Sequence, residues 1–213
     1  MTVKTSEKRI SIKTYAGVNP PKNIPRQVAD VHMKTFTGFF LTFLGEGFLA
    51  HLYKGYCMHS QSGLLVAVEE DRVVGFLAYS KDLSEFYKYI LRKSIVPFAW
   101  YSFLAAFRKP SSIIRIFRAF LKPSESKREE KYIELASIGV LPEMKGHHIG
   151  SQLVNALKEQ FDSEKFEYIK LETDAVNNKA TNHFYVSNGF KLANSYETEE
   201  GRKMNEYRWN NEE

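Results

Sequence analysis

Apolar residues recur along the chain with the spacings of helices and strands. Period-two or continuous apolar runs predict strands at residues 9–15, 63–68, 72–79, 165–173, 190–196 and 203–209. Apolar residues at helical spacing predict a helix from Pro25, a second across residues 48–56, a third from Ile149 to Phe161 and a fourth across residues 178–187. A strand containing Glu134 precedes the third helix, so strands and helices alternate along most of the chain.

The segment 81–131 interrupts that alternation. It interleaves lysines and arginines with many aromatic residues, and Pro97 and Pro110 divide it into two or three helices. Its longest apolar run, residues 95–107, is too short to span a bilayer. We expect a helical insertion that caps the sheet and overlaps with a substrate-lining lid. A membrane-surface or nucleic-acid-binding patch is the alternative, because basic amphipathic helices serve both purposes.

Composition places the chain among globular proteins with one substantial domain. The 213 residues are 43% hydrophobic and 26% charged, and we expect a single domain over 1–213. The net charge of +5 suits a polyanionic ligand without selecting one. Cys57 is the only cysteine, which excludes an internal disulfide and fits a reducing cytoplasm. The polar N-terminus has no signal-peptide core, and no stretch is long and apolar enough for a membrane span.

The most informative segment is the run from Ile138 to Leu153. It reads as a strand ending at a proline, a short basic turn with glycine, and the start of an amphipathic helix. The first turn of a helix carries unpaired N–H groups and partial positive charge, so this arrangement can hold a phosphate or pyrophosphate. A plain strand-to-helix connection is the structural alternative. The candidate binding residues are Ile138, Gly139, Val140, Lys145, Gly146, His147, His148, Ile149, Gly150 and Ser151.

The same run resembles the acyl-CoA motif of the GNAT superfamily of N-acetyltransferases. In that motif a strand ending near V-x-P is followed by [RQ]-x-x-G-x-[GA] on the turn into a helix. Val140, Pro142 and Gly150 match, and Lys145 takes the position of the basic or amide residue. His148 replaces the central glycine, and we expect its backbone to stay close to helical, because a positive φ would cost about 1–2 kcal/mol.

A second stretch resembles the other signature of the family, N-x-x-A-x-x-F-Y-x-x-x-G-F after a strand. The matching residues are Asn178, Phe184, Tyr185, Gly189 and Phe190. Thr181 stands where a small residue is expected. The two signatures occur in the family's order, and the resemblance spans residues 66–209 with its strongest part at 134–190.

This resemblance implies an α/β (α+β) fold with a central mixed, mostly antiparallel sheet of six or seven strands flanked by helices. The insertion, residues 81–131, would then lie between the third and fourth strands. It also implies an acyl-CoA-dependent N-acetyltransferase that uses acetyl-CoA as co-substrate. The acceptor would be a primary amine of a small molecule such as an amino sugar or amino acid. Transfer to a protein amine or aminoacyl-tRNA, and an inactive CoA-binding module, stay open.

Acetyl transfer needs a donor to the thioester oxygen, a proton for the departing thiolate and a base for the amine. A strand N–H of Gly139 or Val140 is the expected donor. In the family, the tyrosine at the position of Tyr185 commonly protonates the thiolate; a core tyrosine is the alternative. Asn178 would contact the cofactor or cap its helix.

The general base is less well marked. Glu134 is the candidate, although a solvent-facing glutamate at a strand end would look the same; Ser137 and Asp174 are weaker candidates. His147 and His148 are adjacent on the chain, point in different directions and lack a Cys or acidic cluster, so no metal site is assigned. We expect a cytoplasmic protein with a small-molecule amine partner and no nucleic acid, while a homodimer stays open.

Overall fold

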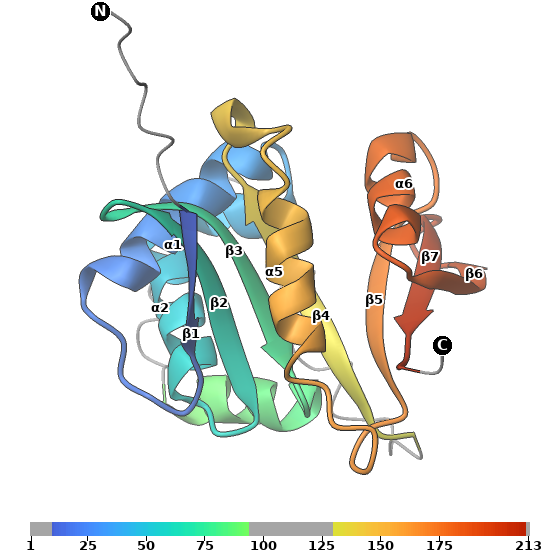
Figure 1. Ribbon diagram of the computed structural model, residues 1–213, viewed down its shortest axis with the longest axis horizontal. Helices are drawn as coiled ribbons and strands as arrows, with labels where there is room; N and C mark the ends of the chain where they lie inside the picture. Colours follow the sequence, from blue (N-terminus) through green and yellow to red (C-terminus); the bar gives the residue numbers. More distant parts are fainter. Residues whose placement is uncertain (1–9, 94–129, 212–213) are drawn as a thin grey trace, which may run out of the picture.

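The computed structural model describes residues 10–93 and 130–211, which build a seven-stranded mixed sheet with helices on both faces (Figure 1). The strands are β1 (Ile10–Tyr15), β2 (Ser62–Glu69), β3 (Arg72–Ser80), β4 (Tyr132–Val140), β5 (Tyr168–Asp174), β6 (Lys191–Glu197) and β7 (Lys203–Trp209). Their order in the sheet is β1-β2-β3-β4-β5-β7-β6. Among these described strands only the β4–β5 pair is parallel, and the helix between the two strands makes the crossover that a parallel pair requires.

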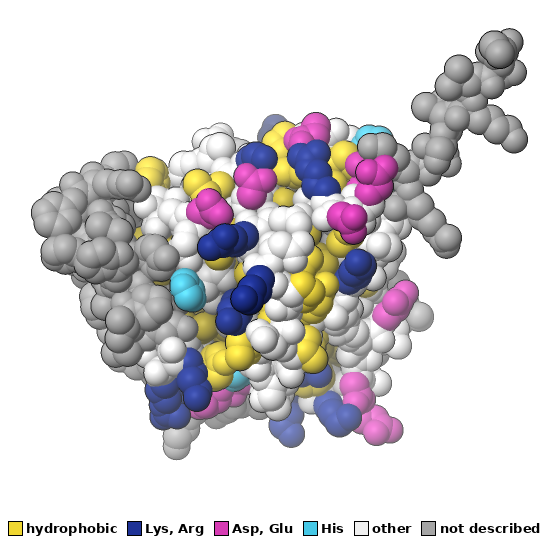
Figure 2. Space-filling model, turned by 90° about the vertical axis from the view of Figure 1, so that its left-hand side faces the viewer, with side chains coloured by type: hydrophobic (Ala, Val, Ile, Leu, Met, Phe, Trp, Pro, Cys, Tyr) yellow, Lys and Arg dark blue, Asp and Glu magenta, His cyan; other side chains and the backbone are white. Residues whose placement is uncertain are grey.

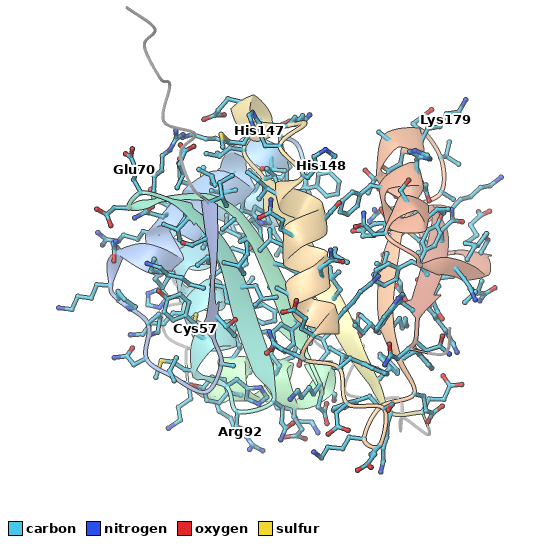
Figure 3. The ribbon with its side chains drawn as sticks, in the orientation of Figure 1. Cys57, Glu70, Arg92, His147, His148 and Lys179 are labelled. Atoms are coloured by element: carbon cyan, nitrogen blue, oxygen red, sulfur yellow. The ribbon has the colours of Figure 1, made fainter. Side chains whose placement is uncertain are left out.

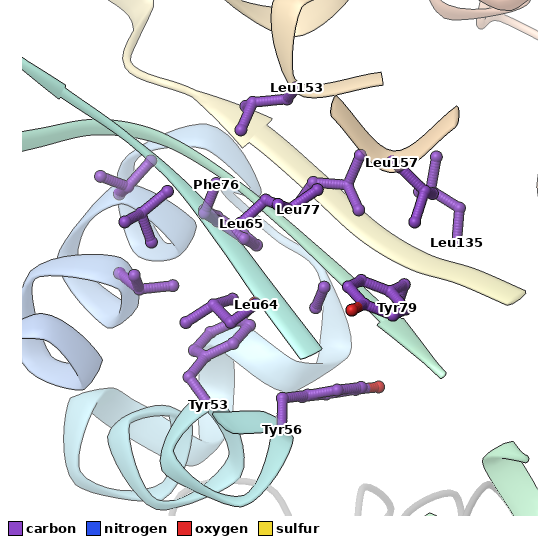
Figure 4. Close-up of a cluster of buried hydrophobic side chains, with 14 of the residues drawn as sticks. Tyr53, Tyr56, Leu64, Leu65, Phe76, Leu77, Tyr79, Leu135, Leu153 and Leu157 are labelled. Atoms are coloured by element: carbon purple, nitrogen blue, oxygen red, sulfur yellow. The ribbon is translucent and has the colours of Figure 1, made fainter. Parts of the chain in front are cut away.

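Helices cover the two faces of the sheet separately. They are α1 (Asn23–Thr35), α2 (Gly45–Met58), α5 (Ile149–Lys158) and α6 (Lys179–Ser187), with short 3-10 turns η1 (Phe40–Leu44) and η3 (Pro142–Met144). Helices α1 and α2 lie behind β2 and β3 in Figure 1, and α5 lies in front of them. Figure 4 shows the resulting core: Tyr53 of α2 packs on one face of β2, while Leu153 and Leu157 of α5 approach the other.

The sequence patterns located these elements to within a few residues. The predicted mixed, mostly antiparallel sheet is confirmed, and so is a long segment between the third and fourth strands. That segment begins as a helix over residues 83–93, whose Phe86 and Ile90 are buried in the core. The rest of the predicted insertion, including its two prolines, lies outside the described residues.

Strand β4 carries the irregularity that shapes the centre of the molecule. Ser137 pairs with Ala78 and Leu135 with Tyr79, so Ala136 is an extra residue that forms a β-bulge and is exposed. The parallel ladder with β5 holds only from Tyr132 to Glu134, whose last partner is Lys170. Beyond that pair β4 and β5 diverge (Figure 1), so their facing edges no longer pair with each other.

The surface seen from the β1 edge mixes charges of both signs, with basic and acidic side chains interspersed among apolar ones (Figure 2). The excess positive charge of the chain is therefore not gathered into a uniform basic patch on this face. Within the described residues, no helix is both long and apolar enough to cross a membrane.

Candidate active site

The diverging edge of β4 presents backbone donors where its partner strand is lost. Leu141 N–H donates to the carbonyl of Val74 on β3 at 2.9 Å. Peptide groups alternate in direction along a strand, so Gly139 N–H also points toward β3. The N–H groups of Ile138 and Val140 point the other way, into the split between β4 and β5. Of the two predicted N–H donors, Val140 therefore points into the split and Gly139 points toward β3, while Ile138 points into the split beside Val140.

Close packing explains why residue 139 is a glycine. A Cβ at this position would lie 2.9 Å from a ring atom of Phe76 on β3 and 3.2 Å from a ring atom of Phe36, which follows α1. Thr35, at the end of α1, donates its hydroxyl to the Val140 carbonyl at 3.2 Å. Strand β4 is thus held against α1 on one face at the point where its edge opens toward β5.

The N-terminus of α5 forms a cradle for an anion beside this edge. The turn Lys145–His148 is exposed, and His148 stands at the head of α5 at the same end of the molecule as Lys179, which begins α6 (Figure 3). Gln152 N–H is the first amide to bond back, to His148 O at 3.0 Å. In the described part of the chain, no side chain caps this helix, so its first-turn amides remain available. The residues present therefore suit a diphosphate.

The backbone of His148 differs from the expectation. Its φ of 56° and ψ of 18° lie in the left-handed region, so the predicted near-helical conformation is wrong. The turn has to reverse abruptly between η3 and α5, and both Gly146 (φ 84°) and His148 adopt positive φ to achieve this. Glycine adopts this conformation most easily, which explains why the acyl-CoA motif that this run resembles has a glycine at the position of His148.

Gly150 serves helix packing as well as the cradle. A Cβ on Gly150 would lie 3.0 and 3.1 Å from two ring atoms of Phe184 in α6. The absence of a side chain therefore lets α5 and α6 approach each other across the diverging strands. The two sequence signatures meet at this contact.

Tyr185 of α6 is buried against the sheet, beside Tyr207 of β7. It is 5% exposed, and its ring lies 5.9 Å from that of Phe190 and 6.0 Å from that of Tyr207. Tyr207 pairs with Leu171, whose side chain shares the sheet face covered by α5. Burial raises the pKa of the Tyr185 phenol above its usual value, so the hydroxyl keeps its proton at neutral pH.

Asn178 stands at the predicted N-cap position of α6, and its side chain turns to the end of β5. Its Nδ2 donates to Thr173 Oγ1 at 2.8 Å and to Asp174 O at 3.2 Å, and within the described residues its side chain makes no capping hydrogen bond to α6. Asn182, which neither signature singles out, also binds Asp174 O and accepts from the Tyr207 hydroxyl at 2.8 Å. The spacing of four between the two asparagines is the sequence signal that marks it. Together they fix the helix that carries Tyr185.

Glu134 lies on the opposite face, toward α2. It occupies the last β4–β5 pair, and its charge raises the pKa of Tyr56 of α2 in addition to the larger effect of burial. Burial disfavours the charge of its partner Lys170, but hydrogen bonding to Glu172 and the nearby carboxylates of Glu172 and Glu134 raise the pKa of Lys170 overall. Glu134 thus lies at the last paired position of β4 and β5, on the sheet face that α2 covers.

Among residues 10–93 and 130–211, no group of three or more His, Cys, Asp and Glu side chains could hold a metal ion. His147 and His148 stand on the exposed turn before α5, each without such a group around it (Figure 3).

Comparison with known proteins gives consistent results. A sequence model of the acetyltransferase (GNAT) family matches residues 32–190. A GNAT-family acetyltransferase structure from Desulfovibrio desulfuricans is 16% identical with a TM-score of 0.62, covering 94% of this chain and 98% of that one. A polyamine N-acetyltransferase from Drosophila melanogaster is 11% identical with a TM-score of 0.53 and coverages of 93% and 99%.

A third similar structure is the ribosomal-protein-S18-alanine N-acetyltransferase from Escherichia coli, with 13% identity, a TM-score of 0.50 and coverages of 94% and 92%. At these identities the structures establish a shared fold. No curated protein sequence matches the chain at a significant level.

Proposed function

The chain belongs to the acetyltransferase (GNAT) family, and we propose that it transfers the acetyl group of acetyl-CoA to the primary amine of a small molecule. Acetyl-CoA is the acyl donor of this fold. The observation that carries the proposal is the split between β4 and β5, which offers backbone donors at its edge and an anion cradle beside it. Both features lie within residues 32–190, the range of the family match.

Binding of the donor would use the α5 cradle. The first-turn amides of α5, from Ile149 to Ser151, would bind the pyrophosphate oxygens, Lys145 would add positive charge at the rim, and His147 would lie beside it. Asn178, whose amide group holds the end of β5, would border the same ligand. The acyl group would then extend into the split, where the N–H groups of Ile138 and Val140 face its carbonyl oxygen.

In the proposed reaction the acid and the base would act from opposite faces of the sheet. The amine lone pair attacks the acyl carbon, and the carbonyl π electrons move onto oxygen. When the carbonyl re-forms, the C–S bond breaks and the sulfur leaves as a thiolate. Tyr185, protonated and on the α5 face, would give that thiolate a proton, while Glu134 on the α2 face would take the proton that the amine loses.

The acceptor is proposed to be a small amine such as an amino sugar or amino acid. One similar structure is a polyamine N-acetyltransferase and another acts on a protein alanine, so the fold accommodates both acceptor classes. Acetylation of a protein amine or of aminoacyl-tRNA is the second candidate, favoured by the basic composition of residues 81–131. An inactive CoA-binding module is the third.

The test is the release of free coenzyme A from acetyl-CoA, measured with a thiol reagent. The amines would be glucosamine, lysine, spermidine, agmatine and a peptide beginning with alanine. Turnover above the amine-free rate with a small amine supports the proposal, and turnover with the peptide alone favours the second candidate. Calorimetric binding of acetyl-CoA without turnover on any amine would favour the inactive module and contradict the proposed enzyme.

A further inference from the structure

The end of helix α1 is fastened to the open edge of β4. Leu141 N–H donates to Val74 O on β3, so in this antiparallel ladder the neighbouring residue Val140 turns both its N–H and its C=O away from β3, toward the split. The hydroxyl of Thr35, the last residue of α1, donates to that Val140 carbonyl at 3.2 Å. The loop that follows α1 therefore begins beside the split.

Two aromatic rings lead outward from this point. Phe36 lies against β4, since a Cβ on Gly139 would be 3.2 Å from one of its ring atoms. The ring of Phe39 stands edge-on to that of Phe36, with 5.5 Å between the ring centres. Phe36 is half-buried, whereas Phe39 is 50% exposed. The two rings thus extend from the β4 residue between the amides that face the split to the surface of the protein.

Hydrogen bonds within the loop hold these rings in place. The Phe36 carbonyl accepts from Phe39 N–H at 3.2 Å and from the Thr42 hydroxyl at 2.7 Å, and Thr42 N–H donates to Phe39 O at 3.1 Å. In the described part of the chain, the exposed large hydrophobic side chains include two aromatic ones, Phe39 and Phe43, and both lie in this loop. Because an exposed ring contributes little to folding, exposed rings held beside the split indicate a surface that another molecule covers.

We propose that the acceptor covers the Phe39 ring, and that it is a primary amine on an apolar body, such as a phenylalkylamine or an amino acid with an aromatic side chain. This inference rests on the proposed acetyl transfer. An apolar body beside the split would remove its own surface and that of the ring from water. A hydroxyl-rich amine would instead give up hydrogen bonds to water that a phenyl ring cannot replace. Phe39 is then a specificity-determining residue that takes no part in bond making.

The first test compares acceptors that differ in one group. Phenylethylamine and ethanolamine share the same two-carbon chain and amine, and they end in a phenyl ring and a hydroxyl respectively; phenylalanine and serine differ in the same way. The assay is release of coenzyme A from acetyl-CoA. We expect kcat/KM to be at least about tenfold higher for the apolar member of each pair, because that factor corresponds to covering about 55 Å² of apolar surface at about 25 cal/mol per Å².

The second test removes the ring. Phe39→Ala should lower kcat/KM for phenylethylamine about tenfold and have a much smaller effect with ethanolamine, so that the preference within the pair is lost. Phe39→Leu keeps an apolar side chain and should retain most of the preference. Thermal melting of each variant verifies that it folds.

The chain offers a matched control at the other end of α2. Met58 is 41% exposed and is the last residue of this 14-residue helix, so it lies about 20 Å along the helix from the end that adjoins the aromatic loop. Met58→Ala removes a similarly exposed apolar side chain and should leave kcat/KM unchanged for all four acceptors. An effect equal to that of Phe39→Ala would mean that the preference does not arise at the split.

Three results would overturn the role of Phe39 while leaving acetyl transfer intact. They are equal kcat/KM values within both pairs, an unchanged preference in folded Phe39→Ala, and turnover of spermidine, glucosamine or an alanine peptide with none of phenylethylamine or phenylalanine. A wild-type protein that acetylates none of these amines would contradict the proposed function, and this inference with it.

Discussion

Replacing His148 with glycine should stabilise the protein, because this residue holds a conformation that disfavours a Cβ. Its φ of 56° lies in the left-handed region, which costs a residue with a side chain about 1–2 kcal/mol. The imidazole is exposed and makes no capping bond to α5 among the described residues, so its removal sacrifices little. Glycine gains more entropy on unfolding, which offsets about 0.5–1 kcal/mol.

The net stabilisation expected for His148→Gly is about 0.5–1 kcal/mol. For a chain of this size, such a change raises Tm by about 1–4 °C. Urea denaturation and thermal melting followed by circular dichroism would measure it, with the m-value checked for constancy. An unchanged or lower Tm would refute the argument that backbone strain at this position is relieved by glycine.

Two other positions with positive φ provide the controls. Gly146 lies in the same turn with φ 84°, and no atom lies within 4 Å of the place that a Cβ would take, so Gly146→Ala should destabilise through strain alone. Asn177 has φ 58°, but asparagine tolerates this region, so Asn177→Gly should gain less than His148→Gly. A gain at Asn177 equal to that at His148 would point to a cause other than strain.

Three further predictions concern the cradle, the acid and the buried histidine. Ser151→Asp adds negative charge to the first turn of α5, so it should keep or raise Tm by the helix dipole while weakening acetyl-CoA binding at least about tenfold in calorimetry; equal affinity would contradict the cradle. Tyr185→Phe should lower kcat by about 100-fold with acetyl-CoA affinity nearly unchanged, and wild-type turnover would return Tyr185 to a packing role. The folded-state pKa of His32 is lowered to about 4 from 6.5, so the stability it confers is complete above pH 6.5 and is lost as pH falls toward 4. Between these limits wild type should lose about 3 kcal/mol more than His32→Phe in urea denaturation, and parallel losses would contradict the assignment.

The sequence by itself determined most of the secondary structure and the family, and it predicted where the site lies. Local patterns suffice for this, since a strand of period two, a turn with glycine and an amphipathic helix are encoded by neighbouring residues. The two signatures around Gly150 and Tyr185 identified the chain as GNAT-like, and the family match and the fold agree. Strand boundaries shifted by a few residues because pairing partners, which lie far away in sequence, decide where a ladder ends.

Only the tertiary structure decided how these pieces act together. The direction of each β4 amide depends on pairing with β3, which assigned Gly139 to packing and Ile138 to the open edge. The left-handed backbone of His148 follows from the path of the chain between η3 and α5. The residue type alone predicted a near-helical backbone there. The contact between His32 of α1 and Tyr53 of α2 joins two helices that only folding brings together, because no local spacing relates these residues.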